Sequence, residues 1–152
     1  MHNELLQKLK ELEGLRLSAY RDAAGVPTIG YGHTRGVRMG DRITAQQADR
    51  LLSQDVAEMM RQVGRLHVAR TIAQQEALTS LAFNIGIARV ASSTLLKRIR
   101  EGASRAVITR EWMRWVYAGG KRLPGLVSRR AWEADHFFAP SYPTDDEIID
   151  RV

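Results

Sequence analysis

The sequence predicts a mostly helical α+β fold, with a small N-terminal β-hairpin lobe joined by a long helix to a helical lobe. Apolar residues recur at helical spacing before residue 13 and through most of the chain after residue 44. Between these stretches, residues 14–43 contain short strand candidates separated by turns rich in Gly and Asp. With 152 residues the chain has room for one domain, or for two small lobes that share a core.

The first elements follow from local spacing. Four leucines lie on one face of a helix that Gly14 ends: Leu5, Leu6, Leu9 and Leu12. Glu13 therefore lies in the last turn of this helix. The turn Asp22-Ala-Ala-Gly25 then separates two strand candidates, which predicts a hairpin with Thr28 on the returning strand. Residues 34–43 are expected to form a loop, with room for a third short strand.

The helices of the second lobe begin at recognisable caps. Thr44 with Gln47 forms a capping box that opens a long helix reaching about residue 63, and Thr71 with Gln74 opens a helix that stops at Gly86. Shorter helices are expected around 94–101, 105–116 and 125–138. The expected folded domain is 1–140, with a sheet lobe at about 14–43 and a helical lobe at about 64–138 plus the first helix. The acidic tail 141–152 is expected to be mobile.

Two carboxylates on separate rigid elements suit cleavage of a glycosidic bond. One must remain protonated to donate a proton to the leaving oxygen, and the other must remain ionised. Glu13, beside apolar Leu12 and Leu15, is the candidate acid, and Asp22, in a polar turn, is the candidate anion. Taken alone, the same residues are better explained as a surface acid and a turn former.

The spacing Glu13, eight residues, Asp22, five residues, Thr28 resembles the catalytic signature of the phage-type lysozymes, glycoside hydrolase family 24. Further segments match in the family's order: E-G-L-R-L at 13–17, T-I-G-Y-G-H at 28–33, R-I-T-A-Q-Q-A-D-R-L-L at 42–52, A-F-N-I-G at 82–86, S-T-L-L at 93–96, W-V-Y-A-G-G-K at 115–121 and G-L-V-S-R-R at 125–130. The resemblance implies a lysozyme-like fold and an endolysin. Such an enzyme cuts the β-1,4 bond between N-acetylmuramic acid and N-acetylglucosamine in peptidoglycan.

The resemblance also implies residue roles. Glu13 would be the proton donor, while Asp22 and Thr28 would hold the attacking water of an inverting reaction. Further residues resemble those that line the saccharide cleft, although core packing and cap chemistry explain them as well: Phe83, Asn84 and Thr94. His33 is expected to be structural. An arginine pairs with the catalytic acid in relatives, and both Arg129 and Arg130 are candidates here.

The three tryptophans are expected in the core rather than stacked on sugars. The four histidines show no metal-ligand spacing, so neither a metal nor a cofactor is expected.

Composition narrows the remaining possibilities. There is no Cys, and no apolar run reaches the ~20 residues that span a bilayer. The N-terminus lacks the features of a signal peptide. We therefore expect a monomer made in the cytoplasm, without stable membrane insertion, that reaches the wall once a holin permeabilises the membrane.

The formal net charge is +6, and residues 97–130 hold ten basic residues against two acidic ones. A basic DNA-binding domain is one alternative, but the chain has no helix-turn-helix or zinc pattern, and no nucleic acid partner is expected. A non-catalytic wall-binding protein is disfavoured by the intact Glu–Asp–Thr set. A lytic transglycosylase would leave Asp22 without a role.

Overall fold

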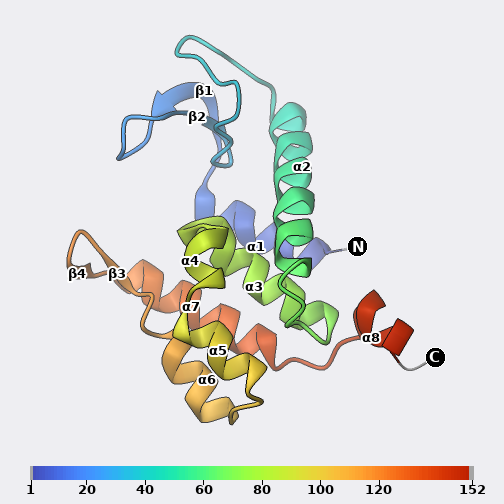
Figure 1. Cartoon of the computed structure of the whole chain (residues 1–152). Helices are drawn as coiled ribbons and strands as arrows, with labels where there is room; N and C mark the ends of the chain where they lie inside the picture. The colour runs from blue at the N-terminus through green and yellow to red at the C-terminus, as the bar shows by residue number, and fades with distance from the viewer. Residues whose placement is uncertain (1, 151–152) are drawn as a thin grey trace. The chain divides into compact units, whose positions relative to one another are not determined.

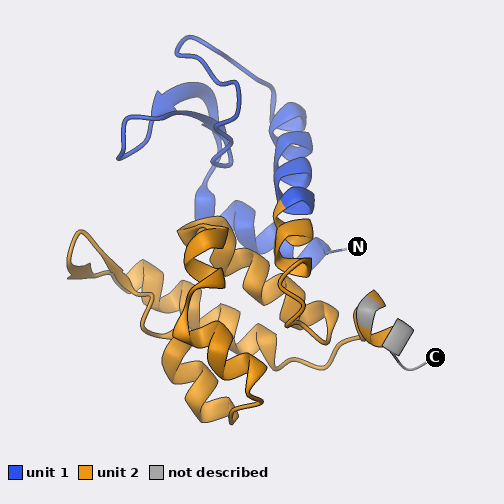
Figure 2. Cartoon of the chain, viewed as in Figure 1, with its two compact units in different colours: residues 1–58 blue, residues 59–152 orange. Residues whose placement is uncertain are grey.

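The computed structural model describes residues 2–150, which form eight helices and four short strands (Figure 1). The chain divides into two compact units, unit 1 at residues 1–58 and unit 2 at residues 59–152 (Figure 2). The boundary falls within α2 (Ala45–Gly64), a helix of 20 residues. The mostly helical α+β class predicted from the sequence is confirmed.

Unit 1 contains α1 (Asn3–Glu13), strands β1 (Arg16–Arg21) and β2 (Pro27–Gly30), and the first part of α2. The two strands pair antiparallel, and Tyr20 lies opposite Thr28 in their register. Residues 41–43 run along the other edge of β1, where the Ile43 amide donates to the Leu17 carbonyl at 2.9 Å. The expected third strand is thus reduced to an isolated bridge between Ser18 and Arg42.

Polar contacts hold α2 to the rest of unit 1. The capping box is reciprocal, since the Gln47 amide donates to Thr44 Oγ1 at 3.1 Å and the Thr44 amide donates to Gln47 Oε1 at 2.8 Å. Farther along α2, His33 Nδ1 lies 2.8 Å from Asp55 Oδ2, and His33 Nε2 lies 2.9 Å from the carbonyl of Arg35. This pairing with an acid agrees with the structural role expected for His33.

Unit 2 is built on α3 (Ile72–Ile85) and α7 (Pro124–Phe137), which pack against each other (Figure 1). Between them in sequence come α4 (Ile87–Ala91), α5 (Thr94–Arg100), α6 (Arg105–Trp112), and the strands β3 (Tyr117–Ala118) and β4 (Lys121–Arg122). The apolar side chains of the core include Val63, Leu78, Leu81, Val90, Leu95, Leu96, Trp112 and Phe137.

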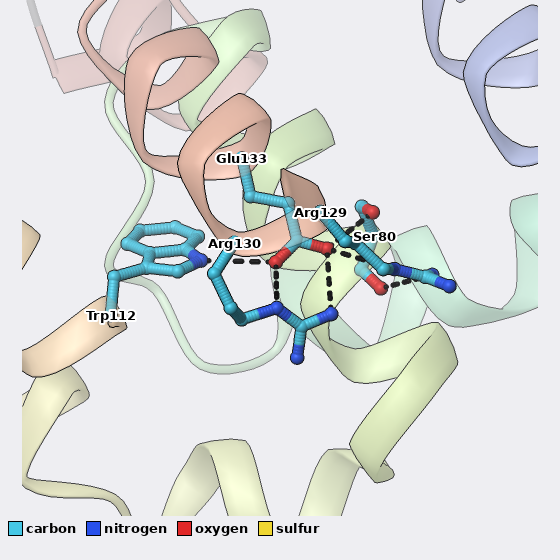
Figure 3. A network of polar contacts seen from close by, with 5 residues as sticks. All are labelled: Ser80, Trp112, Arg129, Arg130 and Glu133. Atoms are coloured by element: carbon cyan, nitrogen blue, oxygen red, sulfur yellow. Dashed lines mark hydrogen bonds and ion pairs between the residues drawn. The ribbon is translucent and has the colours of Figure 1, made fainter. Parts of the chain in front are cut away.

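A polar network lies inside this core (Figure 3). The Glu133 carboxylate accepts from Ser80 Oγ at 2.5 Å and from Trp112 Nε1 at 3.1 Å, and it forms ion pairs with Arg129 at 3.3 Å and Arg130 at 2.7 Å. Arg129 also donates from Nη2 to the Ser80 carbonyl. Desolvation of the buried Arg130 guanidinium lowers its pKa from the usual range, and the opposing attraction of Glu133 is smaller. The single Glu133 carboxylate thus forms ion pairs with two buried guanidinium groups.

The tail after Pro140 pairs with the start of α3 and then forms α8 (Asp145–Asp150). The Ile72 amide donates to the Tyr142 carbonyl at 2.8 Å, and the Ala73 amide donates to Ser141 Oγ at 3.0 Å. The Thr144 amide donates in turn to the Arg70 carbonyl at 2.9 Å. Hydrogen bonds therefore tie residues 141–144 to the start of α3. The mobility expected of the whole tail, whose residues 151–152 lie outside the described residues, stays a prediction.

Other helices match their expected positions, with three differences. Helix α4 (Ile87–Ala91) was not expected from the sequence. The helix expected at 105–116 ends at Trp112, and the glycine pair after it forms the turn of the β3–β4 hairpin. Within the described residues, none of the helices combines the length and the apolar character needed to cross a membrane.

Candidate active site

Glu13 is the last residue of α1, and its side chain is half-buried. The loop after β2 passes close to its carboxylate: a Cβ at Gly32 would lie 3.6 Å from Glu13 Oε2. Gly32 has φ +90°, a conformation that side-chain-bearing residues rarely adopt, so glycine lets the backbone turn beside the carboxylate. The end of a helix and a glycine loop therefore position this acid.

Asp22 forms the turn between β1 and β2. Its Oδ1 accepts two backbone hydrogen bonds, from the amides of Ala24 and Val26, each at 2.9 Å. This Asx-type turn fixes the carboxylate rigidly at the tip of the hairpin. Among the described residues, no hydrogen bond to the second oxygen, Oδ2, is present, so that oxygen keeps its capacity to accept from water. Asp22 is thus both turn former and exposed anion.

Thr28 lies on β2 and is only 3 % exposed. Its hydroxyl donates to the Val26 carbonyl at 2.8 Å. A hydroxyl has a single hydrogen, and with that hydrogen committed the oxygen is left with lone pairs that can accept from a water. Pro27, which lacks an amide hydrogen, precedes it at the first position of the strand, a place where proline is tolerated.

The hairpin register brings Asp22 and Thr28 onto one face. Tyr20 opposes Thr28, and the Asp22 amide donates to the Val26 carbonyl at 3.0 Å, so the ladder continues to the turn. Side chains two residues apart on a strand share a face, and diagonal neighbours on paired strands are about 7–8 Å apart. Unit 1 therefore carries a half-buried carboxylate at Glu13 and, on the hairpin, two oxygen acceptors on one face.

The expected cleft residues belong to unit 2. Phe83, half-buried, and Asn84, exposed, lie in the last turn of α3, and Thr94 is the exposed first residue of α5. Ser93, rather than Thr94, caps α5, because its hydroxyl accepts from the Leu96 amide at 3.1 Å. Cap chemistry therefore does not account for Thr94, and saccharide contact by these three residues remains a prediction.

Sequence reasoning did not single out Glu133. Arg129 and Arg130, the two candidates for pairing with the catalytic acid, both form ion pairs with Glu133 inside unit 2. The signal was present in the sequence, since Glu133 follows them by four and three residues, the spacing of neighbours on a helix. Trp112 is fully buried in this network, in agreement with the core role expected of it.

Comparisons with known proteins agree with the motif resemblance. The phage lysozyme family model matches residues 10–133. An endolysin of Acyrthosiphon pisum secondary endosymbiont phage 1 is 42% identical over 130 residues, which cover 82% of this chain and 88% of the relative. A SAR-endolysin of Bacteriophage PS119 is 35% identical over 82% of this chain and 75% of its own length.

Among solved structures, the muramidase domain of SpmX from Asticaccaulis excentricus superimposes with a TM-score of 0.82. It is 36% identical, and the alignment covers 91% of this chain and 97% of that domain. The residues matched by the family model include Glu13, Asp22 and Thr28. The chain therefore belongs to the phage lysozyme family.

Proposed function

We propose that this protein is an endolysin-type muramidase, which hydrolyses the β-1,4 bond between N-acetylmuramic acid and N-acetylglucosamine in peptidoglycan. The observation that carries the proposal is the geometry of the hairpin, in which Asp22 and Thr28 each keep an acceptor on the same face. Family membership and the endolysins and muramidase domain among its relatives support it. The enzyme would be a glycoside hydrolase that acts on glycan strands of the wall as a monomer.

In the proposed reaction, Glu13 donates its proton to the glycosidic oxygen as the bond from that oxygen to the anomeric carbon breaks. A water attacks the anomeric carbon from the opposite face, and its proton passes to Asp22. The products are two shorter glycans, with Glu13 ionised and Asp22 protonated, and exchange with solvent restores both groups. One water is consumed in each turnover, and no covalent intermediate forms.

The hydrogen bonds of unit 1 suit this division of roles. Asp22 Oδ2 and Thr28 Oγ1 would accept the two hydrogens of the water, which leaves an oxygen lone pair to attack. The two amides on Asp22 Oδ1 keep that carboxylate in place while it receives the proton.

The stereochemistry of the product tests the proposal. Inverting glycosidases keep their two carboxyl groups roughly 6.5–9.5 Å apart so that water fits between them, whereas retaining enzymes have about 5–5.5 Å. We expect fragments with N-acetylmuramic acid at the new reducing end, first formed as the α-anomer. Digestion of purified peptidoglycan with NMR of the earliest products measures both. A β-anomer, or a trapped glycosyl ester on Asp22, would contradict the water-holding role.

A further inference from the structure

The β3–β4 hairpin of unit 2 is formed entirely by exposed residues. Every residue from 117 to 125 is exposed, and 61 % of the Tyr117 surface is accessible. In Figure 1 the hairpin extends away from the helices of its own unit. A two-stranded ribbon of two residue pairs gains little stability by itself. Because this one buries none of its side chains, its sequence is better explained by what it presents to a ligand.

The turn makes the hairpin rigid. Gly119 has φ 58° and Gly120 has φ 76°, and positive φ at both central residues is the mark of a type I′ turn, whose twist matches paired strands. The register pairs Tyr117 with Arg122 and Ala118 with Lys121. Paired residues share one face of a ribbon, and their Cβ atoms are about 4.5–5.5 Å apart. One face therefore carries a tyrosine beside an arginine, and the other carries a lysine.

The positive charges of Lys121 and Arg122 on the β3–β4 hairpin are not balanced by neighbouring acidic residues in the sequence. No acidic residue occurs between Glu111 and Glu133 in the sequence. Glu133 forms ion pairs with the two buried arginines of α7, and Glu111 forms an ion pair with Arg114 at 3.3 Å. Within residues 2–150, neither Lys121 nor Arg122 has an ion-pair partner. The hairpin therefore presents two solvent-facing cations with no anion of the described chain beside them.

This pairing suits a carboxylate on a flexible chain. An arginine guanidinium matches a carboxylate with two parallel hydrogen bonds, and a tyrosine ring beside it covers apolar atoms at low entropic cost. We propose that the Tyr117–Arg122 face of the hairpin binds the carboxylate-bearing peptide branches that a peptidoglycan glycan carries. The inference rests on the proposed function, and it adds a contact with the peptides to the chemistry on the sugars.

Two variants of the same hairpin test the proposal. Arg122→Gln removes the cation beside Tyr117, and Lys121→Gln removes an equal charge from the opposite face. The substrates are intact peptidoglycan and the same glycan after an amidase has removed its peptides. We expect Arg122→Gln to lower kcat/KM on intact peptidoglycan by about tenfold, chiefly through KM, as for the loss of a charge-assisted contact at an exposed site. Lys121→Gln should change it by less than about twofold, and the peptide-free glycan should distinguish neither variant from the wild type.

A chemical control needs no mutation. Amidation of the peptide carboxylates with a carbodiimide and ammonia should lower wild-type kcat/KM to the level of Arg122→Gln, and the variant should then lose nothing further. An equal loss on intact and peptide-free glycan, or no loss with Arg122→Gln on intact peptidoglycan, would overturn the proposal. If wild-type protein cleaved neither substrate, the proposed muramidase function itself would fail, which is a separate result.

Discussion

At the scale of single residues, the Thr28 hydroxyl contributes both to the fold of unit 1 and to the proposed chemistry. Its hydrogen bond to the Val26 carbonyl closes the hairpin turn, and the same bond leaves its oxygen free to accept from a water. We expect Thr28→Val to fold, to lose about 1 kcal/mol of stability, and to lose roughly a hundredfold in kcat because the water is misplaced. Thr28→Ser, which keeps the hydroxyl, should retain most activity; equal activity in the two variants would contradict the role.

Glu13 gives the sharpest prediction at this scale. Glu13→Gln should leave the melting temperature nearly unchanged and lower the rate of reducing-end release from peptidoglycan at least about a hundredfold, because an amide cannot protonate the leaving oxygen. Glu11→Gln, two residues earlier on the exposed side of α1, is the matched control and should retain full activity. Substantial clearance by Glu13→Gln would show that another group donates the proton.

The sequence predicted which residues form the candidate site, but it did not predict their hydrogen-bond geometry. The spacing of Glu13, Asp22 and Thr28 identified a candidate site, and the turn residues around Asp22 predicted its hairpin. The acceptor role of Thr28 depends on where the Val26 carbonyl points, which follows from the turn geometry and not from residue type. In the same way, a glycine pattern cannot show that the Gly32 backbone passes beside the Glu13 carboxylate.

At the scale of elements, caps explain why some helices were predictable. Thr44 and Thr71 each accept a hydrogen bond from the amide three residues later, so local chemistry fixes where α2 and α3 begin. The β3–β4 hairpin was missed because Gly119 and Gly120 also fit a simple break between helices. Long-range contacts were the hardest to foresee, since nothing local to Glu133 shows that Ser80 and Trp112 converge on it.

The network around Glu133 joins α3, α6 and α7 (Figure 3). Glu133→Gln should lower the free energy of unfolding by about 3–5 kcal/mol, because it removes the counter-charge of the fully buried Arg130 guanidinium and an ion pair of Arg129. Denaturant unfolding measures this loss. Glu111→Gln is the control: its partner Arg114 is largely exposed, so the loss should be about 1 kcal/mol or less. A small loss in Glu133→Gln would mean that water enters the network and replaces the carboxylate.

Residues 141 and 142 of the C-terminal tail accept hydrogen bonds at the N-terminus of α3. Tyr142 and Ser141 accept hydrogen bonds from the first amides of α3, groups that have no partner within their own helix. Deletion of residues 141–152 should therefore lower stability by about 1–2 kcal/mol, a shift of several degrees in Tm, while activity at low temperature persists. Deletion of only 145–152 keeps these bonds and should cost less. Equal Tm values for the two truncations would show that the backbone pairing contributes nothing measurable.

At the scale of the whole molecule, the net charge of +6 bears on how the enzyme finds an insoluble substrate. A polymer rich in carboxylates attracts a basic protein over distances set by the Debye length, about 8 Å at physiological ionic strength and about 3 Å at 1 M. This attraction acts on the whole protein, and so it differs from the single contact proposed for Arg122. Added salt should weaken both contributions, but only the first depends on the size of the substrate.

We therefore expect salt to slow lysis of whole walls more than cleavage of short soluble oligosaccharides. A small neutral substrate gains little from long-range attraction, and its cleavage depends on contacts at the site that salt screens weakly. The measurement compares initial rates on both substrates from 50 mM to about 1 M sodium chloride, with circular dichroism to show that the fold persists. If both rates fell by the same factor, the loss would lie in the catalytic step, and the net charge would have no part in how the enzyme engages the wall.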